Sequence, residues 1–205
     1  MTPDKKHTML CLGDSYTIGE AVEESERFPM QAVEMLKKEH VHFDKPVIIA
    51  KTGWTTDELA AVINEQNPTG TYDVVTLLIG VNNQYRGRDL ENYRKEFAEL
   101  LHTALNYAGK KPKHVYVVSI PDWGVTPFGD NDKRGEGQIG KEIDQYNAIN
   151  KEEARKAGVN YIDITPGSRK AKTDADLIAN DGLHPSGKMY KEWAEKLATA
   201  IRNQY

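Results

Sequence analysis

The 205-residue sequence has a single cysteine, Cys11, so no disulfide can form within the chain. Cys11 lies in a short apolar run, residues 8–12, which makes it a small packing residue of a core. This run is too short for the core of a signal peptide, and the sequence has no apolar stretch of membrane-spanning length. We therefore expect a cytoplasmic protein without a membrane span.

An excess of charge of one sign is also missing. The chain has 27 Lys and Arg against 31 Asp and Glu, with the signs interspersed and a net charge of −4. Binding to nucleic acid requires a basic face, so no nucleic-acid partner is expected. No linker rich in Pro, Gly or Ser divides the chain, which predicts a single domain over residues 1–205. The sequence does not determine the oligomeric state.

Motifs for cofactors and metals are absent as well. The sequence contains neither a Walker phosphate loop nor G-x-G-x-x-G, and nothing in it requires a cofactor. His40 and His42 form a His-x-His pair, but no cysteine or acidic cluster stands near them at ligand spacing. We predict that this pair is a solvated surface feature and that the protein binds no metal.

Alternating strand and helix patterns are what the chain does contain. Near-continuous apolar runs rich in β-branched residues predict buried parallel strands at residues 8–12, 46–50, 74–79, 115–120 and 160–164. Helical periodicity marks residues 26–38, 57–65, 93–108 and 139–157, and a last helix follows Gly187. This alternation predicts an α/β fold, a three-layer α/β/α sandwich around a five-stranded parallel sheet.

Two connections between these elements are unusually long. Residues 80–89 and 121–136 are polar or rich in glycine and are predicted as loops at the carboxyl end of the sheet. Loops of this length in a compact domain are usually functional or mobile. We expect both to lie over a residue that follows the first strand.

That residue is Ser15, in Gly13-Asp14-Ser15. A serine at the end of a buried strand places its hydroxyl where α/β folds keep their ligand sites. No helix is predicted to begin directly at Ser15, because Gly19 and a charged loop follow. Asp14 is interpreted as ordering this loop rather than as one of the paired carboxylates of a glycosidase. The sequence also lacks the second glycine of a Gly-x-Ser-x-Gly nucleophile elbow.

A base for the serine is available near the other end of the chain. Asp181 and His184 are three residues apart, so one turn places both side chains on one face. The carboxylate then orients the imidazole, which takes the proton of an attacking serine hydroxyl. Taken singly, Asp181 also fits a turn residue and His184 a surface histidine.

Two further motifs lie between them, Thr52-Gly53-Trp54 and Gly80-Val81-Asn82-Asn83. In this order, the four motifs resemble the GDSL/SGNH hydrolase family over residues 9–185. The resemblance implies a flavodoxin-like strand order, 2-1-3-4-5. It implies a triad of Ser15, His184 and Asp181, and an oxyanion hole formed by the backbone N–H groups of Ser15 and Gly53 and the side-chain amide of Asn82. Asn83 stands where the family often has aspartate, which leaves the hydrogen bonding of that segment open.

Candidates for substrate binding are the residues in or beside these motifs and the long connections. They are Asp14, Trp54, Asn83, Tyr85, Trp123, Phe128 and Leu183. Aromatic and aliphatic side chains at strand ends are typical of an acyl or alcohol pocket. Trp54 and Leu183 fit a position in the core equally well.

The function predicted from these features is that of a serine esterase or acylhydrolase that cleaves small carboxylic esters through an acyl-enzyme on Ser15. Short acyl chains are favoured, because no long apolar lid is present. The alternatives are a thioesterase, a lysophospholipase or a carbohydrate deacetylase of the same family. Others are a catalytically silent binding domain on the same fold and a flavodoxin-like nucleotide or flavin binder, which the missing phosphate loop disfavours.

Overall fold

The computed structural model describes residues 6–204. Its centre is a five-stranded parallel sheet with the order β2-β1-β3-β4-β5. The strands are β1 (Met9–Gly13), β2 (Val47–Ala50), β3 (Val74–Leu78), β4 (Val115–Val118) and β5 (Asn160–Ile162). Each begins and ends within two residues of a predicted apolar run, and the predicted sheet and strand order are confirmed.

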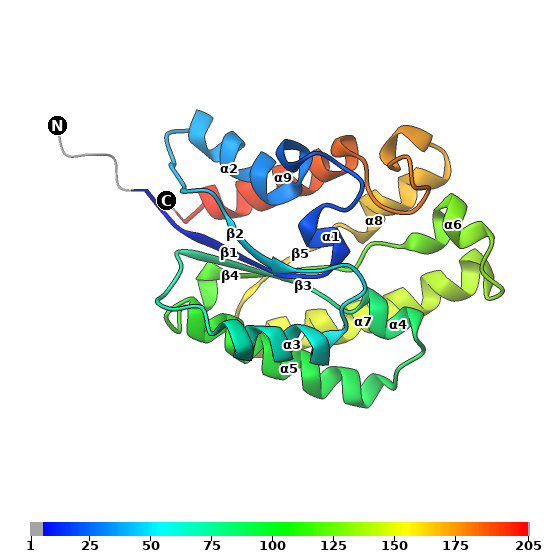
Figure 1. Ribbon diagram of the computed structural model, residues 1–205, viewed down its shortest axis with the longest axis horizontal. Coiled ribbons are helices and arrows are strands. Elements are labelled where there is room, and N and C mark those ends of the chain that lie inside the picture. Colours follow the sequence, from blue (N-terminus) through cyan, green and yellow to red (C-terminus); the bar gives the residue numbers. More distant parts are fainter. Residues whose placement is uncertain (1–5, 205) are drawn as a thin grey trace.

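Helices cover both faces of the sheet (Figure 1). On one face lie α2 (Phe28–Lys38) and α9 (Gly187–Arg202), and on the other lie α3 (Thr56–Gln66), α5 (Leu90–Tyr107) and α7 (Gly135–Ala157). Every residue of β1, β3 and β4 is buried, because both of their faces are covered. The predicted three-layer α/β/α sandwich is confirmed.

An aromatic cluster joins the α2–α9 layer to the start of the functional region. The ring of Trp193 on α9 lies 6.1 Å from that of Phe28 and 5.0 Å from that of Tyr190, centroid to centroid. Tyr16, directly after Ser15, extends the cluster with its ring 6.2 Å from that of Trp193. The residue next to the serine is therefore anchored in the core.

The expectation that no helix begins at Ser15 is wrong. Helix α1 (Ser15–Ile18) starts directly at the end of β1. The Asp14 carboxylate caps it by accepting a hydrogen bond from the backbone N–H of Tyr16 at 3.0 Å. Gly19 ends the helix with a φ of 69°.

The two long connections, predicted as loops, are helical in part. Residues 80–89 contain α4 (Val81–Tyr85), and residues 121–136 contain the 3₁₀ turn η3 (Trp123–Val125), α6 (Pro127–Asp130) and the start of α7. Asp122 caps η3, because its carboxylate accepts from the backbone N–H of Gly124. Thr126 caps α6 in the same way, through a hydroxyl that accepts from the backbone N–H of Gly129. These connections are therefore ordered helical turns.

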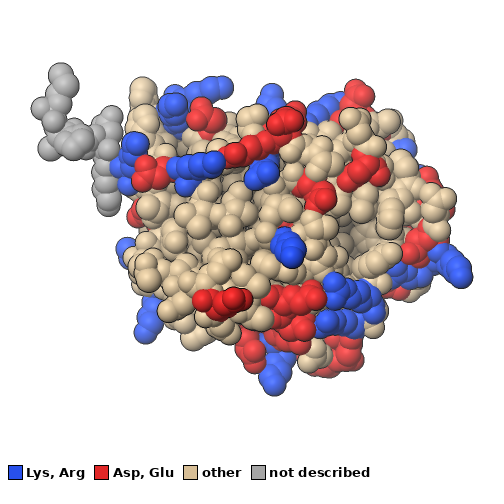
Figure 2. Space-filling view, viewed as in Figure 1, with Lys and Arg blue, Asp and Glu red and all other residues tan. Residues whose placement is uncertain are grey.

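The remaining elements are short. They are η1 (Glu24–Glu26), η2 (Pro112–His114), α8 (Thr165–Ser168), η4 (Arg169–Lys172) and η5 (Ala175–Leu177). Helices α1, α4 and α6 gather at the end of the sheet where the strands terminate (Figure 1). On the face shown in Figure 2, acidic and basic side chains lie in mixed clusters around a largely uncharged middle. In residues 6–204, no helix is both long and apolar enough to cross a membrane.

Candidate active site

Ser15, His184 and Asp181 form a continuous hydrogen-bonded chain at the end of β1. The Nε2 atom of His184 lies 2.9 Å from Ser15 Oγ, and its Nδ1 atom lies 2.5 Å from Asp181 Oδ2. Ser15 and His184 are 5% and 7% exposed. With the Nδ1 proton directed to Asp181, Nε2 is the atom that accepts the proton of the serine hydroxyl.

A tight turn brings Asp181 and His184 onto one side. The other carboxylate oxygen of Asp181 accepts hydrogen bonds from the backbone N–H groups of Leu183 at 3.0 Å and His184 at 2.9 Å. Partial burial raises the pKa of Asp181, but hydrogen bonds from the imidazole and from these two N–H groups lower it more. The net pKa lies below the ordinary value, so this carboxyl is ionised at neutral pH.

The position of Ser15 depends on the glycine that ends β1. A Cβ atom on Gly13 would lie 2.1 Å from Thr17 Oγ1 and 2.4 Å from the carbonyl oxygen of Leu78. Only glycine therefore allows α1 to start this close to the neighbouring strand. Ser15 becomes the first residue of the helix, a position whose backbone N–H has no acceptor within the helix.

Three hydrogen-bond donors lie beside the serine in one cavity. Ser15, Gly53 and Asn82 all line it. Within residues 6–204, the backbone N–H groups of Ser15 and Gly53 have no hydrogen-bond acceptor. The Asn82 amide donates one hydrogen bond to the carbonyl oxygen of Trp54 at 3.0 Å and has a second hydrogen to donate. This set of donors suits a developing oxyanion.

The cavity has a volume of about 160 Å³. Four residues predicted as substrate contacts line it: Tyr85, Trp123, Phe128 and Leu183. Three further lining residues were not predicted: Tyr16, Thr52 and Val81. Thr52 and Val81 are members of two of the four motifs and Tyr16 directly follows a third, and these positions are the only signal that the sequence gives for them.

Asp14 and Asn83 were also grouped with the substrate-binding residues, but both are fully buried and lie outside the cavity lining. Burial raises the pKa of Asp14 to about 7, although a hydrogen bond from the Tyr16 N–H opposes the rise. Its second oxygen has no hydrogen-bond partner within residues 6–204. Trp54 likewise lies outside the lining and packs, half-buried, against the core. These three residues support the site from behind.

The hydrogen bonds of Asn83 explain why an amide suits this position. Its side chain accepts from the backbone N–H of Thr56 at 3.1 Å and donates to Thr56 Oγ1 at 2.7 Å. The Thr56 hydroxyl is thereby free to donate to the Glu96 carboxylate. An aspartate here would compete with Glu96 for that hydroxyl proton. Asn83 thus joins α4 to the start of α3 without adding a buried charge.

Three aromatic rings form one wall of the cavity. The rings of Tyr85 and Phe128 lie 5.5 Å and 5.8 Å from that of Trp123. The Arg134 guanidinium lies 5.6 Å from the centroid of Tyr85 and 5.2 Å from that of Trp123. Trp123 is 2% exposed, whereas Tyr85 and Phe128 are 48% and 42% exposed. The wall therefore has a fixed inner ring and two accessible outer rings.

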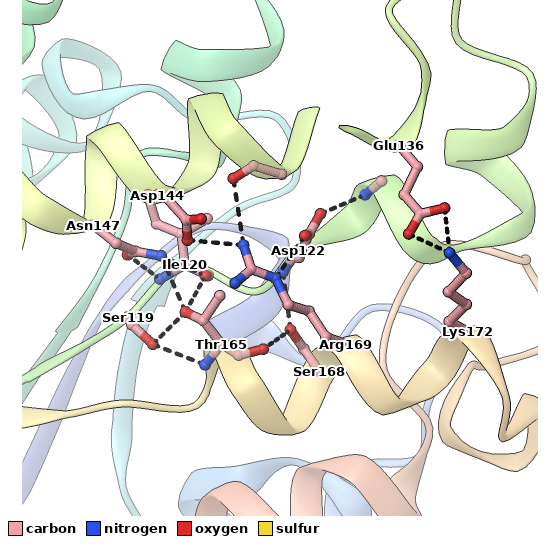
Figure 3. Close-up of polar contacts among 12 residues, drawn as sticks. Ser119, Ile120, Asp122, Glu136, Asp144, Asn147, Thr165, Ser168, Arg169 and Lys172 are labelled. Carbon is pink, nitrogen blue, oxygen red and sulfur yellow. Dashed lines mark hydrogen bonds and ion pairs between the residues drawn. The ribbon is translucent and has the colours of Figure 1, made fainter. Parts of the chain in front are cut away.

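A buried polar network holds the turn that carries Trp123 (Figure 3). The Asp122 backbone N–H donates to Ser168 Oγ at 2.9 Å, and the Asp122 carboxylate accepts from Arg169 Nε at 2.9 Å. Arg169 also contacts Asp144 at 2.8 Å. The indole N–H of Trp123 donates to Gln84 Oε1 at 2.8 Å. Trp123 is thus fixed through both its backbone and its side chain.

No group of three or more His, Cys, Asp or Glu side chains within residues 6–204 is arranged to hold a metal ion. His40 and His42 follow α2, away from the cavity lining.

Comparisons with known proteins identify the family and the fold of the chain. A model of the GDSL-like lipase/acylhydrolase family matches residues 11–192. A search of curated protein sequences gives no significant match. The lipase/acylhydrolase from Enterococcus faecalis superimposes with a TM-score of 0.72 at 18% identity, over 97% of this chain and 96% of that one.

Two other solved structures are similar at comparable levels. Axe2, an acetylxylan esterase from Geobacillus stearothermophilus, has a TM-score of 0.72 at 19% identity, over 98% of this chain and 96% of that one. TesA has a TM-score of 0.70 at 16% identity, over 97% of this chain and 99% of that one. At these identities the structural matches show the shared fold.

The fold and the family match define the protein as a carboxylic ester hydrolase. Because the family model covers most of the sequence, the chain belongs to the GDSL-like lipase/acylhydrolase family.

Proposed function

We propose that this protein is a serine esterase that hydrolyses small-molecule carboxylic esters with short acyl groups through an acyl-enzyme on Ser15. The observation that carries this proposal is the hydrogen-bonded chain from Asp181 through His184 to Ser15. This chain borders a cavity that Gly53 and Asn82 also line, and the N–H groups of Ser15, Gly53 and Asn82 are the proposed oxyanion donors.

In the proposed mechanism, Ser15 Oγ attacks the ester carbonyl carbon while its proton passes to Nε2 of His184. Asp181 stabilises the imidazolium, and the donors of Ser15, Gly53 and Asn82 stabilise the oxyanion. The imidazolium then protonates the leaving alkoxide as the ester C–O bond breaks. Water attacks the acyl-enzyme with His184 again as base, which releases the acid and restores Ser15.

The size of the cavity supports a short acyl group. Its volume of about 160 Å³ is close to the ~150 Å³ of an apolar cavity that holds one benzene molecule. Pockets for drug-sized ligands are several times larger, from about 300 Å³ upwards. The inner wall at Trp123 is buried and fixed, so a longer chain has to extend toward the exposed rings.

An acetyl ester of a carbohydrate is a second candidate substrate. It is favoured by the exposed rings of Tyr85 and Phe128, because the apolar faces of sugar rings stack on aromatic side chains at the mouth of a site. The acetylxylan esterase Axe2 shares the fold. In this variant, the acetyl group enters the cavity and the sugar alcohol is the leaving group.

The proposal is tested by hydrolysis of p-nitrophenyl esters from acetate to octanoate, with wild type and Ser15→Ala compared. We expect turnover that falls with acyl length in the wild type and is lost in the variant. Labelling of the wild type by an organophosphonate ester, but not of Ser15→Ala, separates an enzyme from a silent binding domain. Acetylated xylo-oligosaccharides assay the second candidate. Full activity of Ser15→Ala would exclude the mechanism.

A further inference from the structure

Arg86 makes a contact with the oxyanion segment that none of the four motifs contains. Its Nη2 atom donates a hydrogen bond to the carbonyl oxygen of Gly53 at 2.6 Å. Arg86 follows α4 directly, four residues after Asn82, so both side chains extend from one face of that turn. Asn82 donates to the next carbonyl, that of Trp54, at 3.0 Å. Two residues of one helical turn thus hold two consecutive peptide groups.

Gly53 depends on such contacts because its own conformation is weakly determined. Its φ is 83°, in the region that glycine enters as readily as its mirror image. Among the described residues other than its two chain neighbours, only Arg86 has an atom within 4 Å of the position a Cβ on Gly53 would occupy, Nη2 at 3.9 Å. Lys51 and Thr52, which precede it, are exposed. The peptide that joins Gly53 to Trp54 has one further anchor, a hydrogen bond of 3.3 Å from the Trp54 N–H to the carbonyl oxygen of Lys51.

The direction of the Gly53 N–H matters for the proposed chemistry. An oxyanion donor stabilises the transition state only if its N–H already points at the position where the charge develops. Gly53 lines the cavity, and Arg86 holds its carbonyl, which belongs to the peptide that follows the glycine. The Gly53 N–H belongs to the preceding peptide, so the Arg86 contact acts on it by restricting rotation about the glycine between the two peptides.

The charge of Arg86 acts in the same direction. Its only carboxylate partner among the described residues is Glu58, at 3.4 Å, and that ion pair is partly exposed. A guanidinium beside the oxyanion segment makes the local potential more positive, which favours negative charge on the substrate oxygen.

We propose that Arg86 is a positioning residue for the oxyanion hole, which holds the Gly53 carbonyl and thereby restrains the direction of the Gly53 N–H. This inference depends on the proposed esterase function. It makes Arg86 act on the rate of acyl transfer and leaves substrate affinity nearly unchanged.

The test compares kcat and KM for p-nitrophenyl acetate among Arg86→Gln, Arg86→Lys, Arg86→Ala and the matched control Arg88→Gln. Arg88 reaches the same segment of the chain, but its Nη1 atom contacts the Asp57 carboxylate at 2.7 Å rather than the Gly53 backbone. Because removal of a whole oxyanion donor lowers kcat about 10²- to 10³-fold, we expect misorientation of one donor in Arg86→Gln to lower kcat about tenfold.

Three further readouts separate positioning from a general structural role. KM and the midpoint of thermal unfolding should change little in Arg86→Gln. Arg86→Lys should recover part of kcat, because an ammonium group keeps the charge and one donor but not the planar fork. Guanidinium chloride at a non-denaturing concentration should raise kcat of Arg86→Ala, with sodium chloride at equal ionic strength and the wild type as controls.

Two results would overturn the inference while leaving the proposed function intact. One is an unchanged kcat in Arg86→Gln and Arg86→Ala, with Ser15→Ala inactive. The other is a raised KM at constant kcat, which would make Arg86 a ground-state binding residue. Full turnover in Ser15→Ala, in contrast, would remove the proposed function itself. If Arg86→Gln does not fold, the comparison of Arg86→Lys with Arg88→Gln decides in the same way.

Discussion

Two residues of the cavity lining, Trp123 and Gly53, are held in place in different ways. Trp123 stands on a turn whose Asp122 carboxylate is 4% exposed and accepts hydrogen bonds from Arg169 and from the backbone N–H of Gly124 (Figure 3). Gly53 stands on a segment held by Arg86, whose side chain is 42% exposed. A network around a buried carboxylate therefore fixes the first, although its Arg169 side chain is 37% exposed, and partly solvated side chains on and directly after α4 fix the second.

Because of this difference, we expect mutations on the Trp123 side of the cavity and mutations on the Gly53 side to affect different properties. Breaking a buried charge pair leaves an uncompensated charge and destabilises the fold strongly, whereas exposed ion pairs contribute little to stability. We therefore expect substitutions around Asp122 to act mainly on folding stability. Substitutions around Gly53 should act mainly on the rate of reaction.

The largest expected effect sets the scale for both sides. His184→Ala removes the proposed base that the whole cavity serves, and kcat for p-nitrophenyl acetate should fall by about 10⁴-fold or more. The midpoint of thermal unfolding should change little, because the imidazole lines the cavity and is not packed inside the hydrophobic core. An equally large loss in Asp122→Ala without unfolding would remove the distinction between the two sides.

On stability, Asp122→Ala should have the largest effect of these variants. It removes the buried partner of Arg169 and the cap of η3, and because the Arg169 side chain is itself 37% exposed, the free energy of unfolding should fall by about 2 kcal/mol in denaturant titrations. Asp144→Ala is the matched control, because Asp144 contacts the same guanidinium from a side chain that is 59% exposed. It should cost less than about 1 kcal/mol. Equal costs would show that the network at Trp123 is not a buried support.

On the Gly53 side, Asn82→Ala should lower kcat about 10²- to 10³-fold, the usual loss for one oxyanion donor. The free energy of unfolding should change by far less than in Asp122→Ala, because Asn82 is only half-buried. The measurement is kcat of the variant at saturating ester, together with its denaturation curve. A variant that unfolds readily yet turns over normally would assign Asn82 a structural role only.

The sequence predicts the main elements of the fold and the turn that holds the triad, but it does not show the short helices beside the cavity. The strands and long helices follow from apolar periodicity, and the Asp181–His184 turn is local in the chain, so both are visible in a single sequence. Helices α1, α4 and α6 are single turns of four or five residues, too short for periodicity to show. Caps and tertiary contacts stabilise them instead.

The supports behind the cavity are invisible for a different reason. Arg86 and Gly53 are 33 residues apart, and Arg169 and Asp122 are 47 apart. No local pattern connects such pairs, and an arginine in a polar segment usually indicates only a solvated face. Asp14 and Asn83 stand within the motifs, but their full burial outside the cavity lining depends on tertiary packing, which the motifs do not show.

Asp14 offers a buried carboxylate without a cation, in contrast to Asp122. Its pKa in the folded state is about 7, raised by burial above the ordinary value near 4. Between these two pH values the folded state binds more protons than the unfolded state, so stability falls as pH rises from about 4 to about 7. The lowered pKa of Asp181 has the opposite sign, and its contribution is lost only as pH falls below about 4.

Asp14→Asn should therefore remove the decline between pH 5 and pH 8. The amide oxygen can still accept from the Tyr16 N–H, and the titrating charge is gone. Denaturant titrations at pH 5 and pH 8 should show a variant that gains stability relative to wild type as pH rises. A constant difference between the two proteins would show that Asp14 does not titrate in this range.

The smallest expected effect is at the outer aromatic rings, where neither kind of support operates. Phe128 is 42% exposed, so Phe128→Ala removes little buried surface, and stability should change by less than about 1 kcal/mol. Loss of a partly exposed contact to the leaving group should raise KM about threefold, with kcat unchanged, since it weakens ground state and transition state alike. The effect should be larger for acetylated xylo-oligosaccharides than for p-nitrophenyl acetate if the rings contact a sugar. Equal KM changes for the two substrates would assign Phe128 to the acyl side of the cavity, because the acetyl group is all that these substrates share.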